Sequence, residues 1–329
     1  MPKVMIAPAP LAIVKAEFIK TLSDAGFELK YPKAARQLTE DELLEQMVGV
    51  SAALAGSEPY TAKVFKALPD LKIVARAGVG WDAVDTAAAT EHGVVVTIAP
   101  GTNQDAVAEH TFMLILALAK NLIAQHQPIR DGKWPRQANL PIRGRVLGLV
   151  GLGRIGKAVA LRGLAFGMKI VAYEPYPDRE FTNMNGITLA SLEEVMKQGD
   201  YISLHLPAMA NTKHLINARS LALMKKTAFL INTARGAVVD ELALAEALKN
   251  RTIAGAGLDV FEEEPPPADH PFLKLDNVVF TAHTAGVDTQ SRDEMANLAA
   301  RCIARLAQGE WPGDCIVNPE VKSKFVWKS

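Results

Sequence analysis

The chain has 329 residues, of which 49% are hydrophobic and 22% are charged. This length is about twice that of an average domain, so we expect two domains, and the apolar content excludes a disordered chain. Thirty-six Lys and Arg residues balance thirty-six Asp and Glu residues. No net charge therefore draws the protein to nucleic acid or to an anionic membrane, and any anion that it binds must be held by a local site.

The chain has two cysteines, Cys302 and Cys315, and neither belongs to a C-x-x-C or Cys/His cluster. We therefore expect reduced thiols, no metal site and a cytoplasmic location. The first residues, MPKVMIAPAPLAIV, carry prolines within their apolar stretch, which is atypical of a signal peptide and typical of a first buried strand. The longest apolar run, 112–119, is far shorter than the roughly 20 residues that cross a bilayer, so no membrane span is predicted.

Strand-like runs rich in Val, Ile and Leu alternate with Ala-rich helical stretches, a pattern typical of an α/β protein whose parallel sheets are covered by helices. In the first hundred residues it predicts helices at 11–25, 40–47 and 61–67 and strands at 3–7, 52–55, 73–75 and 94–97. A second series of strands is predicted at 146–150, 169–173, 201–206, 228–232, 255–258 and 278–282. Each series predicts one doubly wound unit.

Two long helices are expected to connect these units. Residues 105–121 are acidic in the first turn and densely apolar afterwards, and so dense an apolar stripe predicts a homodimer interface. A last helix, 290–307, is long enough to return to the first unit, where the chain's tail would pack. The expected boundaries are therefore 1–101 with 290–329 for one domain and 102–289 for the other.

A glycine-rich turn carries the clearest motif. Gly151, Gly153 and Gly156 have the spacing G-x-G-x-x-G between a short apolar strand and an Ala-rich helix. The first glycine permits the tight turn, the second lets the backbone approach a pyrophosphate, and the third lets helix and strand pack closely. Any tight turn between a strand and a helix can collect glycines, but the flanking strand and helix favour a dinucleotide site.

Glu174 follows the next predicted strand, eighteen residues past Gly156. A carboxylate there can accept hydrogen bonds from the adenosine ribose and would repel a 2′-phosphate, which favours NAD over NADP. The alternative is an ordinary acidic loop residue. Arg179, nearby, leaves some use of NADP open.

Polar residues follow several strands of the second series, where ligands bind in open α/β sheets. Arg235 has the planar fork that grips a carboxylate, although it could instead be a surface arginine at a helix end. Asp259 follows another strand. His283, followed by small residues, suits proton exchange with a hydroxyl. From the residues alone its carboxylate partner could be any of three consecutive glutamates, 262–264.

The remaining histidines have simpler interpretations. His110 is expected to pack inside the long helix, and His205 to border a cofactor without reacting. Ordinary exposed or capping roles are expected for His92, His126, His214 and His270.

Over nearly its whole length the chain resembles the D-isomer-specific 2-hydroxyacid dehydrogenases. The segments that carry the resemblance are ARAGVGWDAVD (75–85), DAVAEHT (105–111), GLVGLGRIGKAVA, SLHLPA with Thr212, INTARGAVVDELAL (231–244), GLDVFEEEP (257–265) and TAHTAG. The resemblance implies a flavodoxin-like substrate domain into which a Rossmann NAD-binding domain is inserted. Two positions depart from the family pattern: Glu174 stands where Asp is usual, and Ala282 stands where Pro usually precedes the histidine.

The resemblance also implies the site residues. It selects Glu264 among the three glutamates, so that the catalytic set is Arg235, Glu264 and His283. Asp259 would hold the nicotinamide carboxamide. The full NAD-binding set would be Gly151, Gly153, Arg154, Ile155, Gly156, Glu174, Pro175, His205, Pro207, Thr212, Thr233, Ala234, Arg235, Asp259, His283, Ala285 and Gly286. The substrate would contact Arg76, Gly78, Val79, Gly80, Asn103, Arg235 and His283.

The expected reaction is hydride transfer between NAD and a small-molecule D-2-hydroxy acid, with His283 exchanging the hydroxyl proton. The residues of these motifs most resemble the 3-phosphoglycerate dehydrogenase branch of the family, which acts in serine biosynthesis. The chain would then be a short form without a regulatory domain. Arg76 could reach the substrate phosphate, or could instead pair with Asp82 or Asp85. The alternatives are a glyoxylate or hydroxypyruvate reductase, whose pocket Trp81 would limit, and a non-catalytic NAD(H)-binding sensor or corepressor. Domain closure predicts hinges near residues 100 and 288.

Overall fold

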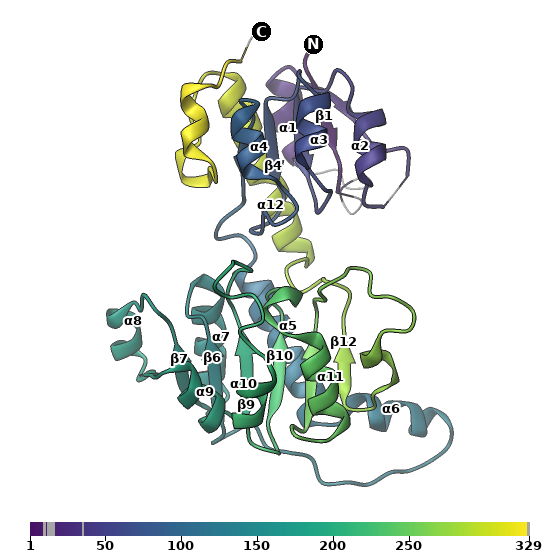
Figure 1. Cartoon of the computed structure of the whole chain (residues 1–329), viewed down its shortest axis with the longest axis vertical. Coiled ribbons are helices and arrows are strands. Elements are labelled where there is room, and N and C mark those ends of the chain that lie inside the picture. The colour runs from purple at the N-terminus through teal and green to yellow at the C-terminus, as the bar shows by residue number, and fades with distance from the viewer. Residues whose placement is uncertain (9–10, 12–16, 35, 328–329) are drawn as a thin grey trace. The chain divides into compact units, whose positions relative to one another are not determined.

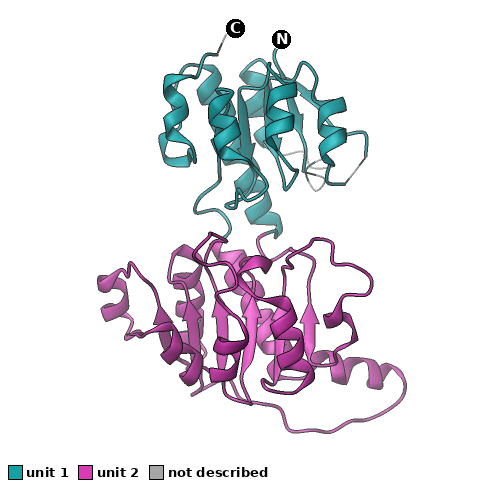
Figure 2. Ribbon diagram, viewed as in Figure 1, with its two compact units in different colours: residues 1–103, 287–329 teal, residues 104–286 magenta. Residues whose placement is uncertain are grey.

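The computed structural model describes residues 1–8, 11, 17–34 and 36–327. The chain forms two compact units, residues 1–103 with 287–329 (unit 1) and residues 104–286 (unit 2), coloured separately in Figure 2. The expected boundaries followed residues 101 and 289, and the chain passes between the units after residues 103 and 286.

Unit 1 contains a five-stranded parallel sheet. Its strands are β1 (Lys3–Ile6), β2 (Glu28–Lys30), β3 (Ala52–Ala55), β4 (Ile73–Arg76) and β5 (Val95–Thr97), in the order β2-β1-β3-β4-β5. This is the strand order of flavodoxin-like folds. The prediction missed β2, because this edge strand has only three residues and none of them is fully buried. An edge strand therefore lacks the apolar run by which the other strands were found.

Helices cover both faces of the first sheet, and the side chains of each strand alternate between them. On β1, Val4 and Ile6 belong to the core cluster under α1 (Glu17–Asp24) and α12 (Thr289–Ala307). Met5 belongs to the opposite cluster, with α2 (Glu40–Gln46), α3 (Ala62–Ala67) and α4 (Thr86–Glu91). Residues 12–16 of the predicted helix 11–25 lie outside the described residues.

The tail returns to unit 1, as expected, and attaches to β5. The side chain of Asn318 accepts from the N–H of Val96 at 2.9 Å and donates to the carbonyl of Val94 at 3.0 Å. Two short helices, η4 (Gly313–Cys315) and η5 (Pro319–Ser323), complete this segment. Cys302 and Cys315 are both buried in this unit as free thiols.

Unit 2 contains a seven-stranded parallel sheet (Figure 1). Its strands are β6 (Val146–Val150), β7 (Lys169–Tyr173), β8 (Thr188–Leu189), β9 (Tyr201–Leu204), β10 (Phe229–Asn232), β11 (Gly255–Leu258) and β12 (Val278–Phe280). The order β12-β11-β10-β9-β6-β7-β8 is the Rossmann order, with β12 added at one edge. Six strands were predicted, because the two-residue β8 has no apolar run. The strand order reverses between β6 and β9, which is where such sheets bind ligands.

Two helical layers cover this sheet. One layer consists of α5 (Gln104–Ala119) and α7 (Arg154–Ala165), and the other of α9 (Leu192–Gln198), α10 (Ala218–Leu223) and α11 (Glu241–Lys249). Side chains of β6 alternate between the two layers. Leu149 belongs to the core cluster under α5 and α7, and Val150 belongs to the core cluster under α9, α10 and α11. The remaining helices are α6 (Leu122–Arg130), α8 (Arg179–Met184), η2 (Gly236–Val238) and η3 (Pro271–Lys274).

The apolar stripe of α5 is buried inside its own unit. Leu114 and Ile115 are fully buried, and the helix packs on α7, β10 and β11. Burial within the unit accounts for most of the stripe, so the stripe by itself no longer indicates a dimer interface on this helix. No single helix of the described chain is long and apolar enough to cross a membrane. The pair α5 and α6 reaches that length and composition only together, across a 63° bend.

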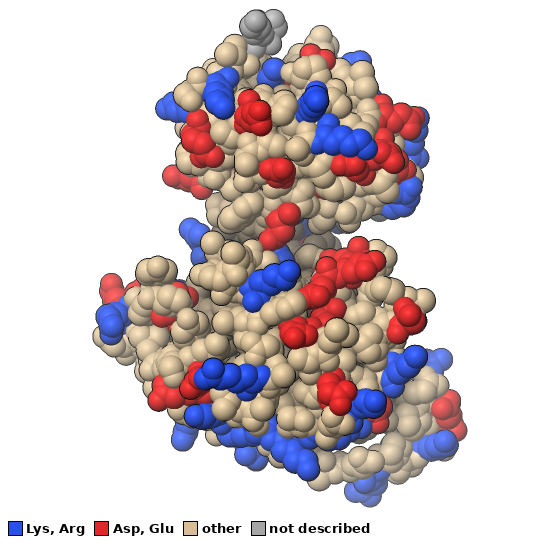
Figure 3. Space-filling model, viewed as in Figure 1, with Lys and Arg blue, Asp and Glu red and all other residues tan. Residues whose placement is uncertain are grey.

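Charges of both signs are mixed on the surface of each unit. Figure 3 shows Lys and Arg side chains and Asp and Glu side chains on both units over the face in view, with several Lys and Arg side chains along the lower edge of unit 2. A mixed surface of this kind agrees with the balanced composition.

Candidate active site

The turn between β6 and α7 leaves a cradle of backbone. Gly151 has φ +100°, and a Cβ atom there would lie 2.4 Å from the carbonyl oxygen of His205. A Cβ at Gly156 would lie 2.3 Å from the carbonyl oxygen of Gly151, whereas one at Gly153 would meet nothing within 4 Å. Gly151 and Gly156 thus allow close packing within the chain, whereas Gly153 faces open space.

This cradle fits the pyrophosphate of a dinucleotide. Gly153 is the N-cap of α7 and supplies no side-chain cap, so the first N–H groups of the helix, which have no partner within it, can bind an anion. Glu174 follows β7, and its carboxylate accepts the N–H groups of Leu152 at 2.8 Å and Tyr176 at 3.1 Å. It joins the glycine turn to the loop after β7. A carboxylate has lone pairs for further donors, so these two bonds leave acceptor capacity for a ribose. Pro175, beside it, is exposed.

The segment after β9 forms the other wall of the cradle. Burial lowers the pKa of His205 to about 3, so the ring is neutral near pH 7. Its Nε2 lies 2.9 Å from Ser203 Oγ, while its buried Nδ1 has no hydrogen-bond partner among the described residues. Thr212 organises the next turn, because its hydroxyl accepts from the Met209 N–H and donates to the Pro207 carbonyl, both at 2.7 Å. An unpaired buried nitrogen beside the turn supports a ligand at this position.

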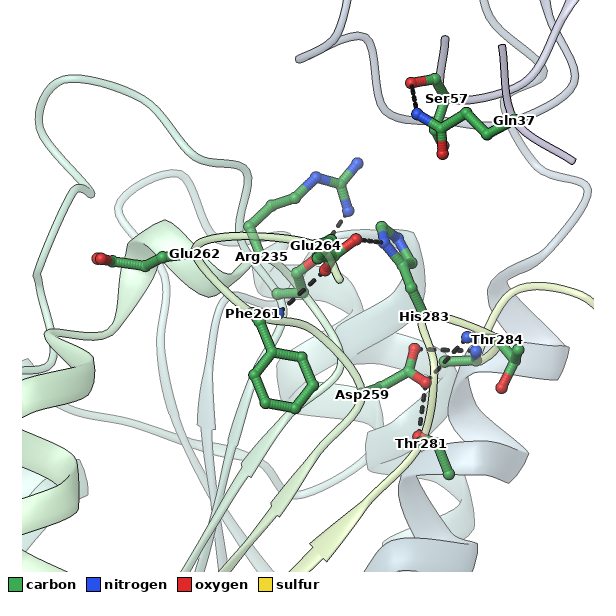
Figure 4. A network of polar contacts seen from close by, with 12 residues as sticks. Gln37, Ser57, Arg235, Asp259, Phe261, Glu262, Glu264, Thr281, His283 and Thr284 are labelled. Carbon is green, nitrogen blue, oxygen red and sulfur yellow. Dashed lines mark hydrogen bonds and ion pairs between the residues drawn. The ribbon is translucent and has the colours of Figure 1, made fainter. Parts of the chain in front are cut away.

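Three strand ends of unit 2 bring Arg235, Glu264 and His283 together (Figure 4). His283 Nδ1 lies 2.6 Å from Glu264 Oε2. A carboxylate can only accept, so Nδ1 carries the proton and Nε2 is left to exchange a proton with a ligand. The His283 side chain is 44% exposed, so solvent or a ligand can reach the ring.

Glu264 is held in its ionised form. Burial raises the pKa of its carboxyl, but the hydrogen bond and charge of His283, the N–H of Phe261 and the charge of Arg235 together lower it below the ordinary value. The two carboxylate oxygens serve different donors, since Oε1 accepts from the Phe261 N–H at 3.0 Å and Oε2 faces His283. Arg235 Nη1 donates to the Ala234 carbonyl at 2.6 Å. The charges of Arg235, Glu264 and His283 thus act on one another.

The loop that carries Glu264 is fastened at both ends by Glu241, the first residue of α11. Glu241 Oε1 accepts the Glu262 N–H at 3.0 Å, and its Oε2 lies 3.1 Å from His270 Nε2. Glu262 also pairs with His214, so this glutamate is occupied elsewhere. The structure therefore decides which of the three consecutive glutamates meets His283. Sequence reasoning gave His270 and His214 no part in this loop.

Asp259 fastens the turn that carries His283. This carboxylate is 1% exposed. It accepts the Thr281 hydroxyl at 2.6 Å, the Thr284 N–H at 2.9 Å and the Ala285 N–H at 2.9 Å. His283 itself has φ 52°, an uncommon conformation for a residue with a side chain. These bonds hold the turn on both sides of Ala282.

Other expected cofactor contacts lie around these strand ends. Thr233 and Ala234 are buried where β10 ends. Arg154 and Ile155 begin α7, and Gly286 is the last residue of unit 2. No group of three or more His, Cys, Asp or Glu side chains in the described part of the chain is arranged to hold a metal ion.

The expected substrate residues of unit 1 lie around the loop after β4. Arg76 is 8% exposed, and its Nε donates to the Gly80 carbonyl at 3.0 Å. Its charge also acts on the buried Glu58, whose pKa is raised by burial and lowered less strongly by Arg76. Arg76 therefore supports the loop 78–80 from within. Asp85 caps α4, and Asn103, 8% exposed, is the last residue before the chain enters unit 2.

Sequence reasoning missed two side chains that touch the site residues of unit 2. His110 Nε2 lies 2.8 Å from Thr281 Oγ1, and Thr111 Oγ1 lies 3.0 Å from Thr233 Oγ1. The sequence predicts only a packing role for His110 inside its helix, and the contact with Thr281 is additional to it. The signal in the sequence is a polar pair, His-Thr, directly before the apolar run 112–119.

Comparisons with known proteins agree with this geometry. The family model described as "D-isomer specific 2-hydroxyacid dehydrogenase, NAD binding domain" matches residues 112–285. The structure of D-lactate dehydrogenase from Aquifex aeolicus, complexed with NAD and lactic acid, superimposes with a TM-score of 0.85 at 28% identity, covering 97% of this chain and 99% of that chain.

Two relatives are similar over nearly the whole chain. A glyoxylate reductase from Korarchaeum cryptofilum is 39% identical over 302 residues, which are 90% of this chain and 91% of the relative. A D-3-phosphoglycerate dehydrogenase from Methanocaldococcus jannaschii is 38% identical over 314 residues, which are 94% of this chain but 59% of the relative. The chain therefore belongs to the D-isomer-specific 2-hydroxyacid dehydrogenase family and is an NAD-dependent oxidoreductase.

Proposed function

We propose that the protein reduces a small, unphosphorylated 2-oxo acid, such as glyoxylate or hydroxypyruvate, to the 2-hydroxy acid. The reaction is supported by the contact between His283 and Glu264, 2.6 Å apart, beside Arg235. When bound, NADH supplies the hydride that carbon 2 of the acid receives. The chain's own residues handle the proton and the charge.

In this proposal His283 donates the proton from Nε2 to the oxygen at carbon 2, because Nδ1 is occupied by Glu264. Glu264 stabilises the imidazolium before the transfer and holds the ring in the tautomer that can take the proton back in the reverse reaction. Arg235 binds the substrate carboxylate and polarises the carbonyl. The N–H groups of residues 78–80 and the side chain of Asn103 are proposed as the substrate contacts that unit 1 contributes.

The choice of an unphosphorylated acid rests on Arg76. The preference for 3-phosphoglycerate came partly from this arginine as a phosphate ligand, but the side chain is buried, donates to the Gly80 carbonyl and faces the charge of Glu58. Relatives that are named glyoxylate reductase also match the chain over most of their own length, 91% in one case and 86% in another. Both lines support a small acid without a phosphate.

The test compares kcat/KM for glyoxylate, hydroxypyruvate and 3-phosphohydroxypyruvate with NADH, in the wild type and in Arg76→Ala. We expect the unphosphorylated acids to be preferred, and Arg76→Ala to lower kcat/KM for all three by a similar factor, because the loop serves every substrate. A preference for 3-phosphohydroxypyruvate that Arg76→Ala alone abolishes would instead assign phosphoglycerate dehydrogenase activity. Tight NADH binding without turnover of any 2-oxo acid would favour a sensor.

We also propose a cytoplasmic homodimer. The two free thiols support the location. The dimer is supported by exposed apolar side chains on α6 and the segment after it, rather than by α5: Leu122 is 55% exposed, Ile123 62%, Ile129 49% and Trp134 77%. So many large apolar side chains close together are unusual on a monomer.

A further inference from the structure

Helix α5 contacts both catalytic strand ends of unit 2 through two consecutive side chains. His110 Nε2 lies 2.8 Å from Thr281 Oγ1, two residues before His283. Thr111 Oγ1 lies 3.0 Å from Thr233 Oγ1, two residues before Arg235. The same helix turn therefore contacts two strand ends of the site. We call the strand end that carries His283 the imidazole arm and the strand end that carries Arg235 the guanidinium arm.

The direction of the hydrogen bonds on the imidazole arm follows from chemistry. Thr281 Oγ1 donates its single proton to Asp259 Oδ1 at 2.6 Å, because an ionised carboxylate can only accept. Towards His110 the same oxygen must therefore accept, so His110 Nε2 carries a proton. The resulting chain, His110 to Thr281 to Asp259, is shielded from water, since the side chains of His110 and Asp259 are 15% and 1% exposed.

This chain ends on the turn that sets the direction of His283. Beyond the Thr281 bond, Asp259 accepts the N–H groups of Thr284 and Ala285, and the His283 N–H donates to the Asp259 carbonyl at 2.7 Å (Figure 4). Together these bonds hold His283 at φ 52°. Loss of the His110 bond leaves the Thr281 hydroxyl held by Asp259 alone, and we expect this to loosen a backbone that is held in an uncommon conformation.

The guanidinium arm is held by a separate set of bonds. Thr111 and Thr233 are 0% and 7% exposed, so each hydroxyl depends on the other for a partner. Next to Thr233, the Asn232 side chain accepts the Ala234 N–H at 3.0 Å and donates to the Arg235 carbonyl at 2.9 Å. The bond between Thr111 and Thr233 thus holds the end of β10, which Arg235 follows.

We propose that His110 and Thr111 are positioning residues for the hydride-transfer reaction, His110 through Thr281 for His283 and Thr111 through Thr233 for Arg235. The two act on separate arms. This inference rests on the proposed function, because it takes His283 as the proton donor and Arg235 as the carboxylate ligand.

The first test compares His110→Leu with His110→Gln. The Gln side-chain NH₂ lies close to the position of His Nε2 and can donate to Thr281, whereas Leu only fills space. We expect His110→Leu to lower kcat by about tenfold, the effect of one hydrogen bond at a preorganised site, and His110→Gln to recover most of it. NADH affinity, measured by fluorescence titration, should change much less than kcat. Equal turnover in the two variants would overturn the proposal, because it would reduce His110 to a packing residue. His126→Leu, at an exposed position of α6, is the control.

The second test uses double variants, with folding checked by thermal denaturation. His110→Leu and Thr281→Val interrupt the same chain, so the pair should lose no more than the worse single variant. His110→Leu and Thr111→Val act on different arms, so their factors should multiply. Two results would contradict the proposal of two separate arms. One is a loss of kcat in His110→Leu with Thr281→Val that equals the product of the single losses, and the other is a loss in His110→Leu with Thr111→Val that is smaller than that product.

His283→Ala separates this inference from the proposed function. If His283→Ala keeps its turnover, the proposed function fails. If His283→Ala loses turnover while His110→Leu keeps the wild-type rate, only the positioning role of His110 fails.

Discussion

Replacing Glu264 by Gln removes one charge and one acceptor from the His283 contact while keeping the shape of the side chain. In the structure the two carboxylate oxygens accept from two donors, the Phe261 N–H and His283 Nδ1. The amide has a single oxygen, so either the Phe261 N–H faces an NH₂ group or His283 does. In the second case Nδ1 must accept from the amide NH₂, so the imidazolium that donates the proton to the 2-oxo acid loses its stabilising partner.

The expected loss follows from the energy of this contact. A hydrogen bond to a charged group contributes about 1.5 to 3 kcal/mol, and a side chain that is 35% exposed belongs in the lower part of that range because water screens it. A loss of about 1.5 to 2 kcal/mol lowers kcat roughly 10- to 30-fold. The assay follows NADH oxidation with a saturating 2-oxo acid. Glu263→Gln, an exposed neighbour with the same loss of charge, is the matched control. Equal turnover in Glu264→Gln and this control would refute the assignment of Glu264 as the partner of His283.

The same variant gives a dependence on pH whose sign can be derived. The pKa of Glu264 is lower in the folded protein than its ordinary value, so the ionised carboxylate stabilises the fold at pH values above the unfolded pKa. This stabilisation is lost as the pH falls through the lowered pKa. The difference in the free energy of unfolding between wild type and Glu264→Gln, measured by urea denaturation, should therefore be largest near neutral pH. It should disappear as the solution becomes acidic. A difference that persists unchanged in acid would show that another interaction is responsible.

Gly151→Ala should lower the free energy of unfolding by about 2 kcal/mol or more, because φ is +100° and the new Cβ would lie 2.4 Å from the carbonyl of His205. Gly153→Ala, with nothing within 4 Å, should change it by no more than about 1 kcal/mol and yet weaken NADH binding about tenfold, as measured by fluorescence titration. Glu174→Ala should lower the ratio of kcat/KM for NADH over NADPH, and an unchanged ratio would exclude Glu174 as the ribose ligand. If the proposed dimer forms through this surface, Trp134→Glu should give a monomer in light-scattering measurements without lowering the melting temperature, since Trp134 is 77% exposed.

The amino-acid sequence by itself determined the features that depend on neighbours along the chain. Short apolar runs located β6, β7 and β11 with their observed bounds, because each strand is buried on both faces. The spacing of Gly151, Gly153 and Gly156 predicted the turn, since the close contacts there are made by backbone atoms. The parallel order of the strands then placed Arg235 and His283 at one edge of the sheet.

Tertiary structure alone decided the features that depend on partners distant in sequence. Three consecutive glutamates are equivalent along the chain, and the bond from Glu241 to the Glu262 N–H helps turn Glu264 towards His283. The contact between Arg76 and the Gly80 carbonyl is likewise a feature of the folded chain that neither interpretation of this arginine predicted. The role of His110 depends on Thr281, which follows 171 residues later along the chain. Hydrophobic patterns repeat locally and can be recognised from the sequence, whereas a hydrogen bond between distant side chains exists only once the sheet and its helices have packed.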